Sequence, residues 1–246
     1  MIIGLHGEAG SGKDQFALYA EEWIYAATQG KFQKLSFAEP VYTLASVIFG
    51  VTVESLGERR KKEIPLWFNV TKEALERAND YWEAEGFAEY ADFAYIWPIF
   101  EEKYFGSRRV NLAGQDEDVI YSIYISAREI LQLLGTEFGR KMVSPSVWKD
   151  YLVRAVKKGK ADFIIVTDVR FNDEAHIIHT IPGMSESIVL NIVSPTTPFA
   201  IKSGHASENG IDKQHIDRTF TNTFEGLEKM KHDVNFFMEE FTFMHI

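Results

Sequence analysis

The stretch Met1-Ile2-Ile3-Gly4-Leu5-His6-Gly7-Glu8-Ala9-Gly10-Ser11-Gly12-Lys13-Asp14 decides the fold of this chain. Its apolar beginning is typical of a short strand, and residues 15–27 place apolar side chains at helical spacing. The glycines between them follow the pattern G-x-x-x-x-G-K. A strand that turns through glycines into a helix directs backbone N–H groups and the positive end of the helix dipole at one point. The stretch therefore predicts a phosphate-binding loop, and the alternative is a glycine-rich turn without a ligand.

The residues predicted to bind the phosphates of a nucleoside triphosphate are Gly10, Ser11, Gly12, Lys13, Asp14 and Gln15. The Lys13 ammonium can follow the β- and γ-phosphates. After the lysine the pattern expects Ser or Thr, whose hydroxyl contacts Mg²⁺, whereas this chain has Asp14. A carboxylate there can hold magnesium directly or through water, or it can cap the helix. The sequence leaves both interpretations open.

Composition limits the function classes. The chain has 246 residues, 46% of them hydrophobic, which fits one sizeable globular domain or two small ones. The net charge of −10 argues against a surface that binds nucleic acid non-specifically, and the lack of cysteine excludes disulfides and thiolate metal sites. The chain shows neither a signal-peptide pattern nor an uninterrupted apolar run of about 20 residues. We therefore expect a cytoplasmic protein without membrane contact.

Strand and helix patterns alternate along most of the chain. Strands are predicted over 1–6, 32–37, 162–167 and 187–193, and more weakly over 215–220. Helices are predicted over 15–27, 40–49, 126–142, 145–156, 172–179 and 223–240. Continuous β-branched runs are typical of parallel strands that are buried on both faces. The alternation predicts an α/β fold with a parallel five-stranded sheet flanked by helices.

Residues 52–125 interrupt this alternation. We predict a core domain of residues 1–51 and 126–246 and an inserted helical region over 52–125, which binds an acceptor or serves as a lid. The insertion contains a basic run between Glu58 and Glu63. That run is either part of an acceptor-phosphate site or a solvated face.

Asp168 and Arg170 directly follow the predicted strand 162–167. Ligands of open parallel sheets bind beyond the carboxyl ends of the strands, so both residues are site candidates, close to the phosphate loop if this strand lies beside the first. An acidic residue there can hold Mg²⁺ through water, and an arginine can bind phosphate in a bidentate way. The alternative is an Asp–Arg ion pair that caps the next helix.

Arg128, Gln132, Thr136 and Arg140 are spaced by four along the predicted helix 126–142, which begins with the capping box Ser126 and Glu129. That spacing places the four side chains on one helical face, otherwise flanked by Ile and Leu. We interpret the stripe as the wall of a binding site, and solvent exposure is the alternative.

In their order, these pieces resemble the phage deoxynucleoside monophosphate kinases over nearly the whole chain. The matching segments are Ser11-Gly12-Lys13-Asp14, Ala38-Glu39-Pro40-Val41, Leu131-Gln132-Leu133-Leu134-Gly135-Thr136-Glu137, Trp148, Thr167-Asp168-Val169-Arg170, His205-Ala206-Ser207-Glu208-Asn209-Gly210 and Asn222. The resemblance implies a P-loop nucleoside-monophosphate-kinase fold. It also implies transfer of the γ-phosphoryl of ATP to a deoxynucleoside monophosphate, with Mg²⁺, for dNTP supply in DNA synthesis.

The resemblance also implies roles for single residues. Lys13, Arg128, Asp168 and Arg170 would be catalytic, with Asp14 and Asp168 holding the metal. Glu39, Gln132, Thr136, Arg140 and Trp148 would surround the acceptor. The segment 194–213, with Lys202 and His205, would lie near the adenine of the donor or act as a mobile cover.

This chain departs from the family pattern at Gln15, where a threonine is usual, and at Tyr42, where a lysine is usual. Arg59, Arg60 or Arg140 could replace that lysine. Two other functions stay open: a kinase of another small phosphorylated metabolite, such as phosphomevalonate, and a non-catalytic nucleotide-binding module. The expected partners are small nucleotides and neither nucleic acid nor membrane, in the host cytoplasm if the protein is phage-encoded. The oligomeric state is open, with a homodimer among the alternatives.

Overall fold

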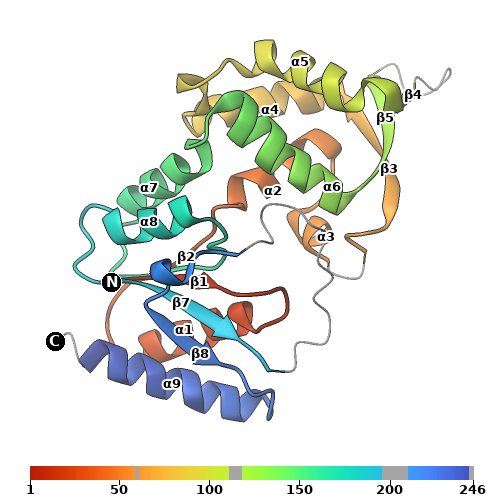
Figure 1. Cartoon of the computed structure of the whole chain (residues 1–246). Helices are drawn as coiled ribbons and strands as arrows, with labels where there is room; N and C mark the ends of the chain where they lie inside the picture. Colours follow the sequence, from red (N-terminus) through yellow and green to blue (C-terminus); the bar gives the residue numbers. More distant parts are fainter. Residues whose placement is uncertain (59–60, 111–117, 196–209, 244–246) are drawn as a thin grey trace. The chain divides into compact units, whose positions relative to one another are not determined.

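The computed structural model (Figure 1) describes residues 1–58, 61–110, 118–195 and 210–243. The chain divides into two compact units. Unit 1 consists of Met1–Phe37 and Leu152–Ile246, and unit 2 consists of Ala38–Tyr151. Within the described residues, no helix is both long and apolar enough to cross a membrane.

Unit 1 contains the predicted parallel sheet. Its strands are β1 (Ile2–His6), β2 (Phe32–Leu35), β6 (Phe163–Val166), β7 (Ser187–Val193) and β8 (Arg218–Thr221). They pair in the order β2-β6-β1-β7-β8, and every pairing is parallel. The prediction of a five-stranded parallel sheet is therefore confirmed, and β6 lies beside β1 as the site argument requires.

Helices cover both faces of this sheet (Figure 1). They are α1 (Lys13–Ala27), α7 (Val147–Gly159), α8 (Asn172–Thr180) and α9 (Leu227–Phe243), with a 3-10 turn, η5, at Lys213–His215. Ile3 and Leu5 of β1 pack in one apolar cluster with residues of α1 and α9. Ile2 packs in the cluster on the opposite face, with residues of α8 and of the part of α7 that belongs to unit 1. This alternation explains why the strands of the sheet are apolar on successive residues.

Unit 2 is not purely helical, so the prediction of a helical insertion was wrong in part. It contains an antiparallel sheet of order β3-β5-β4, formed by β3 (Pro65–Thr71), β4 (Arg109–Val110) and β5 (Val119–Ser126). Its helices are α2 (Glu39–Phe49), α3 (Val53–Gly57), α4 (Lys72–Ala84), η1 (Phe87–Glu89), α5 (Phe93–Phe105), η2 (Gly106–Arg108), α6 (Ala127–Gln132) and η3 (Leu133–Val143). Phe68 and Val70 of β3 are buried, and so are Tyr121, Ile123 and Ile125 of β5. This period of two is a strand signal that the aromatic content of the region obscured.

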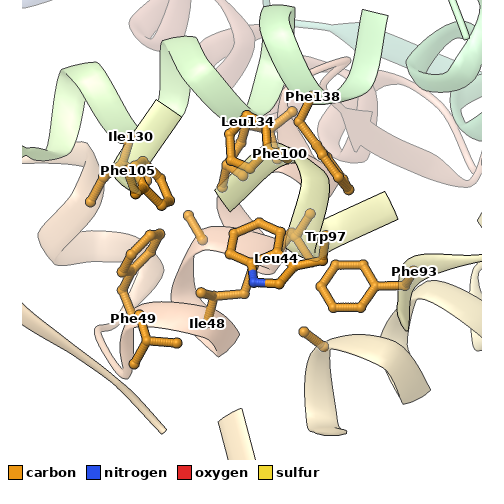
Figure 2. Packing of buried hydrophobic residues seen from close by; sticks show 14 of the residues in the cluster. Leu44, Ile48, Phe49, Phe93, Trp97, Phe100, Phe105, Ile130, Leu134 and Phe138 are labelled. Carbon is orange, nitrogen blue, oxygen red and sulfur yellow. The ribbon is translucent and has the colours of Figure 1, made fainter. Parts of the chain in front are cut away.

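One hydrophobic core joins the insertion to helices on either side of it in sequence. Figure 2 shows Phe93, Trp97, Phe100 and Phe105 of α5 gathered with Leu44 and Ile48 of α2 and with Leu134 and Phe138 of η3. Because α2, α6 and η3 bury their apolar faces in this cluster, the compact unit spans 38–151. The boundaries predicted at 51/52 and 125/126 therefore differ from those of the structure.

The predicted helix 126–142 begins as expected, since the Ser126 hydroxyl accepts a hydrogen bond from the Glu129 N–H. From Leu133 to Val143, however, it is a π-helix with the wider i→i+5 bonding. Trp148 accounts for the irregularity, because its indole Nε1 donates to the Gly135 carbonyl at 2.8 Å. A side chain bonded to a helix carbonyl competes with the regular α ladder.

Candidate functional site

The loop between β1 and α1 depends on glycine. Gly7, Gly10 and Gly12 have φ values of +144°, +85° and +103°, which disfavour residues with a Cβ. A Cβ at Gly7 would lie 2.3 Å from the Ile192 carbonyl oxygen, and a Cβ at Gly12 would lie 2.6 Å from Asn222 Nδ2. Gly7 and Gly12 therefore serve the close approach of this loop to β7 and to the residue after β8.

The loop ends at an uncapped helix N-terminus. Gly12 is the N-cap of α1, and no side-chain hydrogen bond caps the helix within the described residues. The Lys13 Nζ donates to the carbonyls of Gly7 at 2.7 Å and of Glu8 at 2.8 Å. A cation folded over the loop, and N–H groups at the positive end of a 15-residue helix, form an arrangement suited to an anion.

Asp14 is the second residue of α1, so it is not the N-cap of the helix. It is exposed, and no hydrogen bond or ion pair joins its carboxylate to another described residue. A carboxylate at this position still interacts favourably with the helix dipole. Its exposure beside the loop is compatible with the predicted contact to a metal ion.

Asn222, directly after β8, anchors the loop from behind. Its buried amide Nδ2 donates to the Ser11 carbonyl at 3.0 Å, while its Oδ1 accepts from the Phe224 N–H at 3.1 Å. The Ser11 hydroxyl is itself buried, without a hydrogen-bond partner among the described residues. In the sequence, Asn222 was noticeable only through the resemblance, because its partner lies 211 residues away.

Asp168 and Arg170 follow β6 and differ in the contacts of their side chains. The Asp168 carboxylate accepts from the Ser36 hydroxyl and from the Phe37 N–H, both at 2.8 Å. The Arg170 side chain is exposed and makes no ion pair within the described part of the chain. At the start of α8, the Glu174 carboxylate instead accepts a hydrogen bond from the Phe171 N–H at 3.2 Å. The Asp–Arg helix cap considered as an alternative is therefore not formed.

His6 links the end of β1, directly before the phosphate loop, to the turn after β6. It ends β1, and its Nδ1 lies 2.8 Å from the Val169 carbonyl oxygen. Burial lowers the pKa of His6, the hydrogen bond to Val169 raises it, and the positive charges of Lys13 and Arg170 lower it further. The charges of Lys13 and Arg170 thus both act on one imidazole, and the role of Arg170 stays a prediction. Sequence reasoning missed His6, because a histidine at the end of an apolar strand carries no motif.

The predicted stripe lies in unit 2. Arg128 belongs to α6, whereas Gln132 is its last residue and Thr136 and Arg140 belong to η3. All four residues are half-buried, which differs from the solvent-exposed alternative. The Arg128 Nε is paired with Glu63, and its backbone N–H donates to the Lys62 carbonyl at 2.9 Å.

Trp148 and Glu39 were both predicted near an acceptor. Trp148 is only 4% exposed and belongs to the hydrophobic core, where its ring packs against Gly139. The structure thus shows Trp148 supporting the π-helix, and direct contact with a nucleotide stays a prediction. Glu39 is exposed in the first turn of α2.

Lys62 occupies the neighbourhood of Tyr42, where the family pattern has a lysine. The Lys62 Nζ donates to the Tyr42 hydroxyl at 2.5 Å and lies 5.0 Å from the centre of the ring. Of the expected replacements, Arg140 lies in the stripe, and Arg59 and Arg60 lie outside the described residues. Sequence reasoning noticed the basic run 58–63 but could not select the cation within it.

The remaining predictions concern the segment 194–213 and the metal. Lys202 and His205 lie outside the described residues. Among the residues that the structure describes, no group of three or more His, Asp or Glu side chains could hold a metal ion. Mg²⁺ often binds to one or two carboxylates together with substrate phosphates and water, so Asp14 and Asp168 still fit such an ion.

Comparison with known proteins identifies a relative of known activity. The chain is 43% identical over 238 residues to the deoxynucleoside-5'-monophosphate kinase of Escherichia phage T5, and the match covers 95% of this chain and 94% of the relative. No protein-family model matches the chain.

Proposed function

Because the chain belongs to the family of deoxynucleoside-5'-monophosphate kinases, we propose that it transfers the γ-phosphoryl group of ATP to a deoxynucleoside monophosphate. The products are the deoxynucleoside diphosphate and ADP, and the biological role is dNTP supply for DNA synthesis. The observation that carries this proposal is the phosphate loop beside the Asp168–Arg170 turn at the carboxyl ends of the adjacent strands β1 and β6.

The donor phosphates bind to the loop of unit 1. Backbone N–H groups of residues 10–15 and the Lys13 ammonium contact the β- and γ-phosphates, and the dipole of α1 adds to their attraction. Lys13 gives up its hydrogen bonds to the Gly7 and Glu8 carbonyls when a phosphate replaces them. Gly7 and Gly12 let the loop lie against β7 and Asn222, where a Cβ would collide.

The acceptor binds through residues of unit 2. Arg128 and Arg140 supply guanidinium groups for its phosphate, while Gln132, Thr136 and Glu39 offer hydrogen-bonding groups to the sugar or base. Lys62 supplies the ammonium that position 42 lacks, held in place by the Tyr42 hydroxyl. Trp148 acts on Thr136 and Arg140 through the π-helix that it supports.

The reaction requires positioning and charge stabilisation more than covalent chemistry. The attacking oxygen of the acceptor phosphate is already anionic, so no general base is needed. Arg170 neutralises charge that spreads over the transferred group. Mg²⁺, when bound, shields the phosphates of the donor, and Asp14 is the carboxylate that fits it better, because both Asp168 oxygens already accept hydrogen bonds.

The substrates are free nucleotides in the cytoplasm. The net charge of −10 opposes binding to nucleic acid, whereas a local group of cations suffices for a small anion. A homodimer remains a prediction that sedimentation equilibrium tests.

An acceptor panel tests the proposed function. ADP release is measured with MgATP and each of the common deoxynucleoside monophosphates, with phosphomevalonate and without acceptor. We expect turnover that depends on a deoxynucleoside monophosphate, and a drop in kcat of about 100-fold or more in Lys13→Ala and in Arg170→Ala, because each removes a cation from the transferred phosphoryl group. In Arg170→Ala, the Kd for ATP should change little.

Lys31→Ala is a matched control, because Lys31 is an exposed lysine directly before β2, outside the loop. Turnover with phosphomevalonate alone would assign the chain to the rival kinase class. Tight ATP binding without acceptor-dependent turnover would assign it to the nucleotide-binding modules.

A further inference from the structure

The hydrogen bond of His6 has only one direction. Its partner is the Val169 carbonyl oxygen, 2.8 Å from Nδ1, and a carbonyl oxygen accepts but cannot donate. His6 Nδ1 therefore carries the proton, and the neutral imidazole is the Nδ1–H tautomer. Val169 is 1% exposed, so its carbonyl has little access to water as an alternative donor.

The peptide group that His6 contacts is the one before Arg170, and it is held at both ends. His6 bonds its carbonyl oxygen, and the Glu174 Oε2 accepts from its N–H, the N–H of Arg170, at 2.8 Å. The Val169 N–H also donates to the Leu5 carbonyl at 3.0 Å. Glu174 is 3% exposed. The first two bonds fix the plane of the peptide before Arg170 and with it the N–Cα bond from which Arg170 starts, while the bond of the Val169 N–H holds the preceding peptide.

We propose that His6 is a positioning residue for Arg170, holding its peptide so that the guanidinium is directed at the transferred phosphoryl group. The inference rests on the proposed function of the site, because that function supplies the phosphoryl group that Arg170 would contact. His6 is the last residue of β1, directly before the phosphate loop, and its side chain bonds to the turn after β6. One side chain thus ties the donor loop and the arginine to a common frame.

The charge state of His6 agrees with this role. Burial and the charges of Lys13, from α1, and Arg170, from the turn after β6, lower its pKa, against the hydrogen bond to Val169. A neutral ring keeps its donor at Nδ1 without adding a third positive charge to those of Lys13 and Arg170.

Two amide variants test which ring nitrogen matters. The amide nitrogen of His6→Asn takes the place of Nδ1, whereas that of His6→Gln takes the place of Nε2. We expect His6→Asn to retain kcat within about threefold, and His6→Gln to lose about tenfold or more, with the KM for ATP little changed in both. His232→Gln, at a histidine with 78% side-chain exposure on α9, is the matched control. Equal kcat values for His6→Asn and His6→Gln would overturn the inference.

Two NMR measurements test the contact independently of kinase activity. Long-range ¹H–¹⁵N correlations at pH 8 should show the Nδ1–H tautomer of His6, and the Nε2–H tautomer would overturn the inference. The Arg170 amide should exchange with solvent at least about tenfold faster in His6→Gln than in His6→Asn, and equal rates would likewise overturn it. If the unmodified protein lacked kinase activity, the proposed function would fail, and these measurements would still decide whether His6 holds the Arg170 peptide.

Discussion

Asp14 shows how one residue in a familiar loop can carry a different chemistry. It stands where Ser or Thr is usual, in the first turn of α1, with its carboxylate exposed. The hydroxyl of a serine is a neutral metal ligand, whereas a carboxylate brings a negative charge to a site that also binds phosphates. In a site that binds magnesium, a carboxylate attracts the ion more strongly than a hydroxyl does, but it also repels the phosphates of the donor.

We expect Asp14→Ser to raise the Mg²⁺ concentration needed for half-maximal activity several-fold, because a neutral oxygen replaces a charged ligand. Magnesium titrations at saturating nucleotide measure this value. Glu228→Ser removes a first-turn carboxylate from α9, outside the phosphate loop, and serves as the control for a lost helix-dipole interaction. If both variants keep the magnesium requirement of the unmodified protein, Asp14 is a first-turn acid and not a metal ligand.

At the scale of elements, the π-helix η3 is held by the packing of Trp148. A Cβ at Gly139 would lie 2.1 Å from Trp148 Cζ2, and the indole also donates to the Gly135 carbonyl. Gly139 thus makes room for the indole, and the backbone of Gly135 accepts its hydrogen bond. Because η3 carries Thr136 and Arg140, this packing also sets where half of the polar stripe lies.

Gly139→Ala should lower the free energy of unfolding by about 1–3 kcal/mol, since a buried tryptophan must shift to admit the methyl group. Denaturant titration followed by tryptophan fluorescence measures the change. Gly57→Ala is the matched control, because a Cβ at Gly57 would meet no described neighbour within 4 Å, and its effect should stay within about 0.5 kcal/mol. A Gly139→Ala variant as stable as Gly57→Ala would contradict the packing account.

At the scale of the whole molecule, each unit has its own hydrophobic core. The core of unit 2 contains most of the aromatic clusters, whereas unit 1 has one apolar cluster on each face of its sheet. The phosphate loop belongs to unit 1 alone, and the polar stripe belongs to unit 2. A ligand of the loop therefore stabilises unit 1 directly.

We expect MgATP at about 100 times its Kd to stabilise unit 1 by about 2.7 kcal/mol and to raise its unfolding midpoint by about 5–10 °C. Scanning calorimetry with and without nucleotide measures the shift. If the scan resolves two transitions, the transition of unit 1 should shift more than that of unit 2. Lys13→Ala should lose most of the shift, and a variant that kept it in full would contradict the assignment of the donor site.

The sequence by itself determined what depends on neighbours along the chain. The glycine pattern predicted the phosphate loop, the β-branched runs predicted the parallel strands, and Ser126 with Glu129 predicted a helix start, because turn chemistry, periodicity and capping act over a few residues. The position of Asp168 and Arg170 followed from the rule for parallel sheets, once β6 lay beside β1.

Only the tertiary structure decided the contacts between distant residues. The donation of Asn222 to Ser11, the His6 bond to Val169 and the Lys62 contact with Tyr42 each join parts of the chain that no local pattern connects. The π-helix and the limits of unit 2 also depend on such contacts, since Trp148 and the shared core override the local preference for a regular helix. Side chains that meet only after folding leave no periodic signal, because their spacing in sequence is arbitrary.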